Sequence, residues 1–532
     1  MLPGAKLRPN RKTRCHCGEA NMKRNPTAAI TVITLLAALA LPAPLAAQHT
    51  RYKLIDIGTF GGPASYLGDP GVGPGVLHLN NRGVLIGHAD TAFSDPNAPD
   101  NCDNPDCFLS HGFRWEDGVL TDLGTLPGGN RSQAISINAR GWIAGGSTTG
   151  EFDPLTGLLQ FHTALWTDTE IIDLGTLGDG RNSVAVHVSN GGQIVGFSTV
   201  NTTPDPFSFG GASIHPFIWQ NGAMRDLGTL GGPDALASPG CANERSGLVT
   251  GFSFINSTPN PDTGAPTAHA FLWQDGRMID IPTFGGTLVS GELDAGALCV
   301  NNRGQVAGAS TLPGDSVLHP FLWDRGVLTD LGTLGGDNGI VGWLNDAGEA
   351  VGGADTPGGE AFHATLWRNG VIADLGTLAG DCFSVANAIN SNNQIVGASF
   401  NCDTNTLRAV LWDKGSIVDL NTLIPSNSSL ELFDVTNIND RGEIAGRALP
   451  AGCDDVHFCG HVFLLIPCDN AATCESNAGV TTVGIQNTAA LFNRPSTAST
   501  QTPRTPLQLL SAWRARLAHR YHIRGLRAWP RD

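Results

Sequence analysis

Alternating apolar and polar residues predict short β-strands along most of this sequence. Residues 269–284, HAFLWQDGRMIDIPTF, predict a strand ending at Trp273, a tight turn at Gln274–Gly276 and a second strand through Asp280. The turn residues Asn, Asp and Gly supply the positive φ angles that tight hairpins require. Near-copies of this hairpin begin at His111, His162, His215, His319, His363, Arg408 and His461.

A second hairpin follows each copy, as in AISINARGWIAGGS at 134–147. The last Asp of the first hairpin recurs at spacings of 66, 51, 53, 54, 50, 44 and 45 residues, as Asp56, Asp122, Asp173, Asp226, Asp280, Asp330, Asp374 and Asp419. The second hairpin has a turn Asn at Asn80, Asn138, Asn243, Asn301, Asn345, Asn390 and Asn439, with Ser189 in the third copy. A glycine closes every copy, at Gly87, Gly145, Gly196, Gly251, Gly308, Gly352, Gly397 and Gly446.

Two hairpins give four short strands per repeat, which is typical of a β-propeller blade. A solenoid is the less favoured interpretation, because the repeat period of solenoids is usually shorter than the period of this sequence. The repeats begin with a lone strand, YKLIDIGTF at 52–60, and end with another, HVFLLIP at 461–467. Unpaired strand edges would stay exposed unless the two pair. We therefore predict an all-β, eight-bladed propeller closed by pairing of the N-terminal strand with the last repeat.

Small residues, such as Ser183, Ala185 and Ala386, favour the third strand of each repeat as the innermost one. The N-terminal strand would then be the outer strand of the last blade. The loops that lead to the next HAF strand vary in length, and the longest runs from 89 to 110. Variable loops on a rigid scaffold are where specificity would reside.

The N-terminal segment resembles an export signal. Residues 22–47 hold Lys23 and Arg24, then an apolar run of about fifteen residues, then small residues before Gln48. The run is short for a membrane span, which needs about 20 residues. We expect cleavage after Ala47, Met22 rather than Met1 as the start, and no membrane span in the mature chain. An uncleaved anchor is the alternative.

The ten cysteines outside residues 1–21 are an even number, which in an exported chain predicts disulfides. A Cys-based zinc site is the rival, but no CxxC spacing occurs. Cys241 and Cys299 both lie two residues before a turn Asn, so they could approach each other on inner strands. The local pairs are Cys102–Cys107, Cys382–Cys402, Cys453–Cys459 and Cys468–Cys474.

Charge excludes one class of partner. Residues 48–493 carry 17 Lys and Arg against 46 Asp and Glu, a net charge of about −29. Phosphate binding needs a basic surface, so we expect no nucleic-acid partner. Envelope glycans or other extracellular proteins remain as partners.

Residues 468–532 form a separate linker and basic tail. A Ser/Thr/Pro-rich stretch at 495–506 precedes LQLLSAWRARLAHRYHIRG, where Leu510, Trp513 and Leu517 fall on one helical face. A short helix that docks on the acidic repeats is favoured over attachment to an anionic surface. The domains are thus 1–47 leader and signal peptide, 48–467 propeller and 468–532 tail.

HAFLW, DLGTLGG and the IN-x-x-G-x-x-x-G hairpin together resemble the HAF-repeat family of extracellular bacterial proteins, over about residues 52–467. The resemblance implies export and a propeller-like repeat fold, and it brings no established catalytic residues. Some members look anchored through a C-terminal sorting segment. This chain has no C-terminal apolar span, so surface anchoring does not carry over.

No catalytic, cofactor-binding or metal-binding residue can be assigned from these motifs. Each HAF histidine recurs with the same local Asp and Trp, which favours a structural pair over metal ligation. The repeat tryptophans favour packing over sugar platforms. Neither HExxH, GxSxG nor a phosphate-binding glycine loop occurs. The acidic loop with Asp95, Asp100, Asp103 and Asp106 is a candidate for calcium, but its spacing fits no EF-hand and a solvated loop is favoured.

The sequence thus predicts a secreted or cell-envelope propeller that acts as a binding or interaction protein of unknown ligand. An extracellular polysaccharide hydrolase or lyase on a propeller scaffold is the alternative, and a structural envelope component is the third hypothesis. Catalysis is the less favoured outcome.

Overall fold

The computed structural model describes residues 50–68, 75–96, 98, 106–155, 157–204, 212–241, 243–260, 266–290, 298–468, 474 and 481–483. The leader and signal peptide, and most of the C-terminal tail, lie outside these residues. Strands dominate the described part of the chain. No helix there is both long enough and apolar enough to cross a membrane.

The strands form antiparallel sheets of four in which the third strand of each sequence repeat is one edge and the second strand of the HAF hairpin is the other. The first sheets are β2 (Gly61–Tyr66), β3 (Leu85–Ser94), β4 (Phe108–Glu116) and β5 (Val119–Asp122); β6 (Ser132–Ile137), β7 (Ile143–Phe152), β8 (Leu159–Trp166) and β9 (Ile171–Asp173); β10 (Ser183–Val188), β11 (Ile194–Pro204), β12 (Ala212–Gln220) and β13 (Ala223–Asp226); and β14 (Ala235–Ala237), β15 (Leu248–Pro259), β16 (Pro266–Gln274) and β17 (Arg277–Ile281).

The remaining sets repeat this order. They are β18 (Cys299–Val300), β19 (Val306–Thr311), β20 (Leu318–Asp324) and β21 (Val327–Asp330); β22 (Gly339–Leu344), β23 (Ala350–Asp355), β24 (Phe362–Arg368) and β25 (Val371–Asp374); β26 (Phe383–Ile389), β27 (Ile395–Asn401), β28 (Thr406–Asp413) and β29 (Ser416–Asp419); and β30 (Leu430–Ile438), β31 (Ile444–Pro450) and β32 (His461–Cys468) with β1 (Arg51–Asp56).

Three connections depart from the simple four-strand pattern. A single parallel pair, Phe362 with Phe383, joins the β22–β25 and β26–β29 sets into one larger sheet. The short strand β33 (Thr481–Val483) adds in parallel to the outer side of β5. Strand β1 pairs with β32, from Arg51 opposite Cys468 to Asp56 opposite Phe463. The predicted pairing of the N-terminal strand with the last repeat is therefore present.

Helical turns are few. The described residues hold η1 (Pro357–Gly359), η2 (Leu420–Thr422) and α1 (Val456–Cys459). The last lies between β31 and β32.

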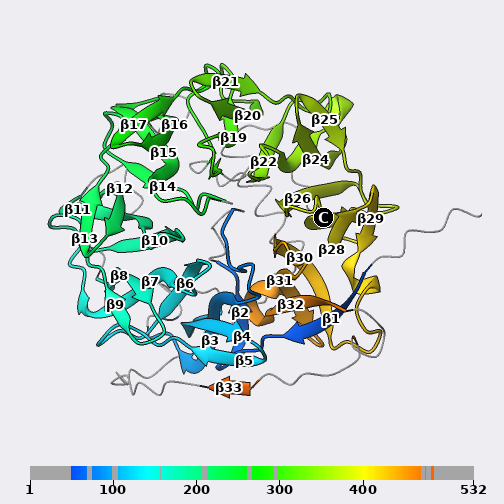
Figure 1. The fold of residues 1–532 in the computed structure, drawn as a ribbon, viewed down its shortest axis with the longest axis horizontal. Coiled ribbons are helices and arrows are strands. Elements are labelled where there is room, and N and C mark those ends of the chain that lie inside the picture. The colour runs from blue at the N-terminus through cyan, green and yellow to red at the C-terminus, as the bar shows by residue number, and fades with distance from the viewer. Residues whose placement is uncertain are drawn as a thin grey trace, which may run out of the picture. The chain divides into compact units, whose positions relative to one another are not determined.

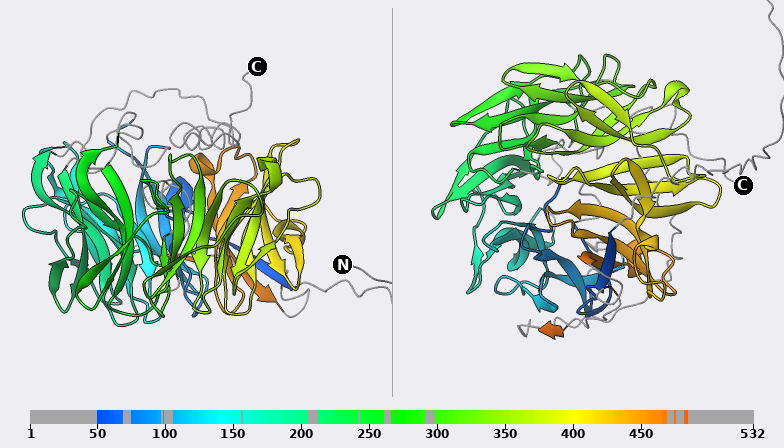
Figure 2. Two further views of the ribbon diagram at one scale, coloured as in Figure 1. Left: turned by 90° about the horizontal axis from the view of Figure 1, so that it is seen from above. Right: turned by 45° about the vertical axis from the view of Figure 1, so that its right-hand side comes forward.

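The core lies between successive sheets, which pack side by side in every view (Figures 1 and 2). One apolar cluster joins Ile55 of β1 and Leu464 of β32 to Leu85 and Phe113 of the β2–β5 sheet. Another joins Leu272 of β16 to Phe321 of β20. Because each sheet buries both faces against neighbours, its strands carry apolar residues on both sides.

The closing glycines have a steric reason. The edge strands β6 and β26 each contain a bulge, between Ala134 and Ser136 and between Ala386 and Ala388. A Cβ atom added to the facing closing glycine, Gly145 in β7 for example, would collide with a backbone carbonyl oxygen of the bulged strand. Only glycine fits this close backbone approach.

Disulfides connect the described cysteines as predicted. Cys241 and Cys299 join the β14–β17 and β18–β21 sheets, with their Cα atoms 5.1 Å apart. The local pairs present are Cys382–Cys402, Cys453–Cys459 and Cys468–Cys474. Cys107 is also disulfide-bonded, and its predicted partner Cys102 lies outside the described residues. Disulfides on this scale are compatible with an extracellular protein.

Candidate functional site

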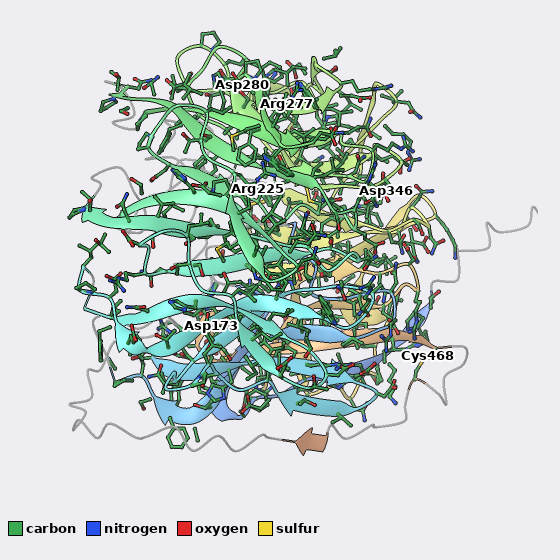
Figure 3. All side chains as sticks on the ribbon, turned by 60° about the vertical axis from the view of Figure 1, so that its left-hand side comes forward. Asp173, Arg225, Arg277, Asp280, Asp346 and Cys468 are labelled. Carbon is green, nitrogen blue, oxygen red and sulfur yellow. A yellow bond between two sulfur atoms is a disulfide. The ribbon has the colours of Figure 1, made fainter. Side chains whose placement is uncertain are left out.

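The HAF histidines pair with the aspartate eleven residues later in the same hairpin. His269 Nδ1 lies 2.7 Å from Asp280 Oδ1, and His215 Nδ1 lies 2.9 Å from Asp226 Oδ2. Figure 3 shows Asp280 on its outer hairpin. The same pair recurs at His111–Asp122, His162–Asp173, His319–Asp330, His363–Asp374 and, across the chain ends, His461–Asp56. The structural role predicted for these histidines is confirmed.

In every pair except His269–Asp280, the aspartate also caps the following turn. Asp226 Oδ1 accepts a hydrogen bond of 2.7 Å from the Gly228 N–H. Partial burial would raise the pKa of Asp226, but the hydrogen bonds from His215 and the Gly228 N–H outweigh it and lower that pKa. The Asp226 carboxylate therefore uses its hydrogen-bond acceptors within its own hairpin and the turn that follows it.

The repeat tryptophans pack as predicted. The Trp166 and Trp412 indole N–H groups donate to the carbonyl oxygens of Leu123 and Leu375 in the preceding sheet, at 3.0 and 2.9 Å. Those buried are Trp115, Trp166, Trp273, Trp323, Trp367 and Trp412. These side chains link neighbouring sheets and offer no free platform for a sugar ring.

The turns between the third and fourth strands of the repeats are connected from one sheet to the next. The Asn138 side chain donates to the Ser189 carbonyl at 2.9 Å, and the Asn301 side chain donates to the Asn345 carbonyl at 3.0 Å. The same contact runs from Asn439 in the last sheet to Asn80 in the first, also at 3.0 Å. The turn Asn thus holds each turn against its neighbour.

The residue after the turn Asn, or after Ser189 in the third copy, connects neighbouring turns through hydrogen bonds to carboxylates. Asn302 donates to Asp346 Oδ2 at 2.7 Å, and Asn190 donates to Glu244 Oε2 at 2.9 Å. Burial, and then the charges of Asp346 and Asp440, raise the pKa of Glu244. Among the described residues, no three His, Cys, Asp or Glu side chains are placed to hold a metal ion, so these acids define no metal site.

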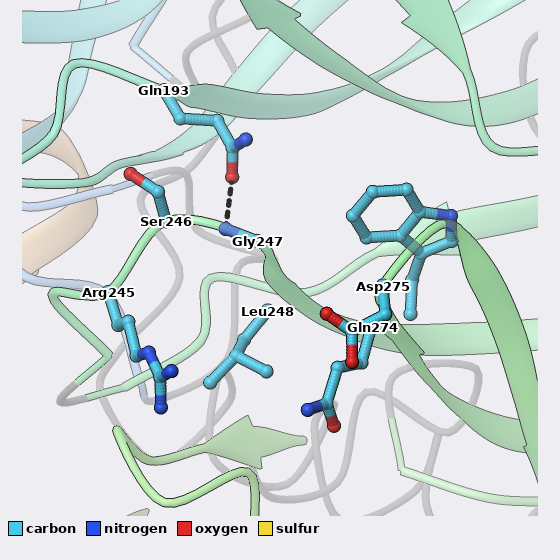
Figure 4. A pocket seen from close by; sticks show the side chains of 8 residues that line it. Gln193, Arg245, Ser246, Gly247, Leu248, Gln274 and Asp275 are labelled. Atoms are coloured by element: carbon cyan, nitrogen blue, oxygen red, sulfur yellow. Dashed lines mark hydrogen bonds between the residues drawn. The ribbon is translucent and has the colours of Figure 1, made fainter.

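One small pocket opens beside the turn of the β14–β17 sheet (Figure 4). Its volume is about 170 Å³. Gln193 borders it on one side and its side-chain oxygen accepts from the Gly247 N–H at 2.7 Å. The lining residues are Gln193, Arg245, Ser246, Gly247, Leu248, Trp273, Gln274 and Asp275. The sequence analysis placed Trp273, Gln274 and Asp275 only in a strand and its hairpin turn and named no binding residue here. One signal was available, because Gly251 follows Asn243 by eight positions whereas Gly308 follows Asn301 by seven.

A second polar region is buried around Tyr66. The Tyr66 hydroxyl lies 2.9 Å from Asp106 Oδ2 and 3.1 Å from the His457 carbonyl oxygen, and its ring stacks on His88 with centroids 5.0 Å apart. Burial, and then the charges of Asp90 and Asp106, raise the pKa of Tyr66. Because Tyr66 is 1% exposed, this cluster is closed to a substrate.

Three buried histidines stand apart from the HAF pairs. Both ring nitrogens of His78, His88 and His187 lack a hydrogen-bond partner within the described part of the chain. Burial lowers the pKa of His88 to about 3 and that of His187 to about 4. Burial, and then the nearby His88, lowers the pKa of His78 to about 3. These residues are therefore neutral in the folded protein.

The acidic loop uses its described carboxylates internally. Asp95 is buried and lies 3.9 Å from Arg131, while Asp106 accepts from the Phe108 N–H at 3.1 Å. Asp100 and Asp103 lie outside the described residues. Calcium binding by this loop stays a prediction.

Matches to this chain occur among solved structures but not among protein families or curated sequences. Neither a protein-family model nor a curated protein sequence matches the chain. The β-propeller domain of the Trilobed protease from Pyrococcus furiosus matches at 8% identity with a TM-score of 0.36, over 62% of this chain and 93% of that domain. Dipeptidyl peptidase 4 from Porphyromonas gingivalis matches at 10% identity and 0.40, over 64% and 54%. An acylaminoacyl peptidase matches at 10% identity and 0.38, over 73% and 58%. The chain thus spans little more than half the length of these last two.

These matches correct the function predicted from the sequence. We expected a secreted or cell-envelope binding or interaction protein, with an extracellular polysaccharide hydrolase or lyase as the alternative, whereas the three solved structures named above are peptidases or a domain of one. That interpretation is contradicted and is not retained. At 8 to 10% identity the likeness concerns the fold, and it assigns no catalytic residue to this chain.

Proposed function

We propose that residues 51–468 form a closed eight-bladed propeller that holds extended polypeptide segments for a peptide-hydrolysing reaction. The blade count follows if the β22–β25 and β26–β29 sets, joined by one residue pair, are counted separately. The hydrogen bond from Asn439 to the Asn80 carbonyl supports closure, since it connects the last and first sheets as other turns connect neighbours. Membership of the HAF-repeat family and export through residues 22–47 belong to the same proposal.

The pairing of β33 with β5 carries the functional part. Thr481, Thr482 and Val483 lie opposite Val119, Leu120 and Thr121 in parallel register. The outer edge of a sheet in this protein therefore accepts an added strand. Strand addition recognises polypeptide through its backbone, so it suits many sequences.

Equivalent outer edges are open in several other sheets of the described residues, and β21 and β25 carry the most exposed apolar side chains among them. Within the described residues, no strand pairs with the outer side of β21 or β25. Their first residues, Val327 and Val371, are 63% and 65% exposed. An exposed strand edge with apolar side chains is a ready template for another strand. A polypeptide held there is extended, which leaves its peptide bonds accessible to a hydrolase.

The test uses the full chain and a labelled peptide with the sequence of residues 478–487, AGVTTVGIQN. Fluorescence anisotropy should report binding, and the double variant V327K/V371K should weaken it roughly tenfold. Val119→Lys, on the edge already occupied by β33, is the matched control and should change binding little. A peptide with proline at alternate positions should not bind, because it cannot donate the ladder hydrogen bonds.

Mass spectrometry of the same mixture tests hydrolysis separately. Cleavage products that depend on the chain support the full proposal. Unchanged anisotropy with AGVTTVGIQN would refute strand addition, and intact peptide after prolonged incubation would refute hydrolysis by this chain.

A further inference from the structure

The pocket beside Leu248 arises from an irregular repeat. The turn Asn243-Glu244-Arg245-Ser246-Gly247 is one residue longer than Asn301-Asn302-Arg303-Gly304. The φ angles of Gly247 and Gly304 are +88° and +77°, so these two glycines occupy the same place in their turns. Leu248 consequently stands where the next repeat has Gln305.

A polar side chain at the position of Leu248 and Gln305 normally forms a hydrogen bond or ion pair with the residue opposite it on the next strand. Gln305 Nε2 donates to Asp324 Oδ2 at 3.2 Å, and Gln193 Nε2 donates to Gln220 Oε1 at 3.3 Å. In the β22–β25 set, Glu349 forms an ion pair of 2.5 Å with Arg368. The side chain at this place therefore fills the space beside the turn and satisfies its partner.

Leu248 cannot do this. It lies opposite Gln274, and an aliphatic side chain offers the Gln274 carboxamide neither a donor nor an acceptor. No side-chain hydrogen bond of Gln274 occurs within the described part of the chain. The pocket thus borders the place that a Gln or Glu side chain occupies in other repeats, with the Gln274 side chain beside it.

The lining suits an amide. Leu248 and Trp273 are 5% and 7% exposed and form an apolar floor. The exposed Arg245 and Asp275 at the rim carry opposite charges. Together they favour a neutral polar ligand over a cation or an anion. A cavity of about 150 Å³ can hold a benzene-sized molecule, so about 170 Å³ accommodates an amide with its adjoining carbons.

We infer that this pocket is a binding site for a carboxamide group, which pairs with the Gln274 side chain as Gln305 pairs with Asp324 in the next repeat. The group could belong to a free amino-acid amide such as glutamine or to a glutamine or asparagine side chain of a peptide. The inference is independent of strand addition at the outer edges.

The decisive variant restores the repeat. Leu248→Gln in the full chain should fill the pocket with its own carboxamide, so ligand affinity should fall roughly tenfold, the equivalent of one hydrogen bond. Saturation-transfer NMR with free L-glutamine and with N-acetyl-Gly-Gln-Gly-amide compares the two sources. Gln305→Leu, which makes the same change in reverse one repeat away, is the control and should leave affinity for the Gln274 site unchanged.

Gln274→Ala provides a second route, because it removes the proposed partner without filling the pocket. It should weaken both probes to the same extent as Leu248→Gln, while the thermal midpoint of both variants stays close to that of the parent. Stronger signal from the tripeptide assigns the site to a peptide side chain, and stronger signal from glutamine assigns it to a free amide. Absence of binding by the parent protein, or equal binding by parent and Leu248→Gln, would overturn the inference.

Discussion

Histidine occurs in two regions of this protein with opposite surroundings. In the outer hairpins each HAF histidine has an aspartate partner, and the side chain of His269, for example, is 15% exposed. In the sheet interiors His78, His88 and His187 are at most 4% exposed, and their ring nitrogens have no hydrogen-bond partner in the described residues. The outer histidines contribute a local hydrogen bond, whereas the inner ones fill space as neutral rings. The same residue type therefore confers stability in one region and acid sensitivity in the other.

The largest expected effect is the loss of stability at low pH that the buried histidines cause. An unfolded histidine binds a proton near pH 6.5, but His78 and His88 in the folded protein do so only near pH 3. The folded state binds fewer protons between these values, so stability falls as the pH is lowered from 6.5 to 3. Linkage gives roughly 3 kcal/mol per buried histidine at pH 4. Urea unfolding at pH 7, 5.5 and 4 should show this loss.

The matched variant for this prediction is His187→Ala, because Ala388 occupies the equivalent place two residues before a turn Asn. Its stability should change less with pH than that of the parent, by roughly 3 kcal/mol between pH 7 and 4. A slope insensitive to His187→Ala would contradict the buried-histidine account.

One repeat carries Arg408 at the position of the HAF histidine and extends the comparison to an ion pair. Arg408 pairs with Asp381, not with Asp419 of its own hairpin, and the Asp381 side chain is fully buried. Breaking a buried pair costs about 3 kcal/mol, because one charge is left unpaired. Asp381→Asn should therefore destabilise the protein by about that amount at pH 7 in urea unfolding.

The control for Asp381→Asn is Asp419→Asn, at the place where the other repeats bind histidine. Asp419 Oδ1 accepts from the Asn421 N–H at 2.9 Å, and an asparagine oxygen can do the same. We expect a change below about 0.5 kcal/mol. Equal losses in the two variants would show that Arg408 relies on its own hairpin after all.

A difference smaller than that for Asp381→Asn is predicted within the outer hairpins. Asp226 accepts from His215 and from the Gly228 N–H, whereas Asp280 is followed two residues later by Pro282, which has no N–H to donate. Asp226→Ala should therefore cost about 1 kcal/mol more than Asp280→Ala, the value of one hydrogen bond. Chemical unfolding of the two variants measures the difference, and equal costs would rule out a contribution from the turn cap.

Much of the fold could be predicted because each local sequence pattern recurs in several repeats. The closing Gly251 has an equivalent in every repeat and the turn at Gln274–Gly276 has equivalents in most, and the structure places them as close backbone approach and hairpin turn. The pairing of Cys241 with Cys299 followed from their common distance to the turn Asn. These features depend on short-range geometry that a sequence pattern records directly.

The candidate site could not be predicted in the same way, because it depends on departures from the repeat. The extra residue before Gly247 matters only once Leu248 is seen opposite Gln274. The partner of Arg408 is 27 residues away, so no spacing rule within the hairpin identifies it. The burial of His88 depends on its stacking against Tyr66, which no periodicity reveals.

The antiparallel pairing of β1 with β32 also determines how the protein would respond to tension. Arg51 lies opposite Cys468, so the first and last strands of the repeat array begin and end at adjacent points. A force pulling those two points apart would load the residue pairs one after another, beginning at Arg51 and Cys468, instead of shearing all of them together. The first sheet contact to open under load would therefore be the one between the two ends of the repeat array, while the hairpins within each repeat would stay paired.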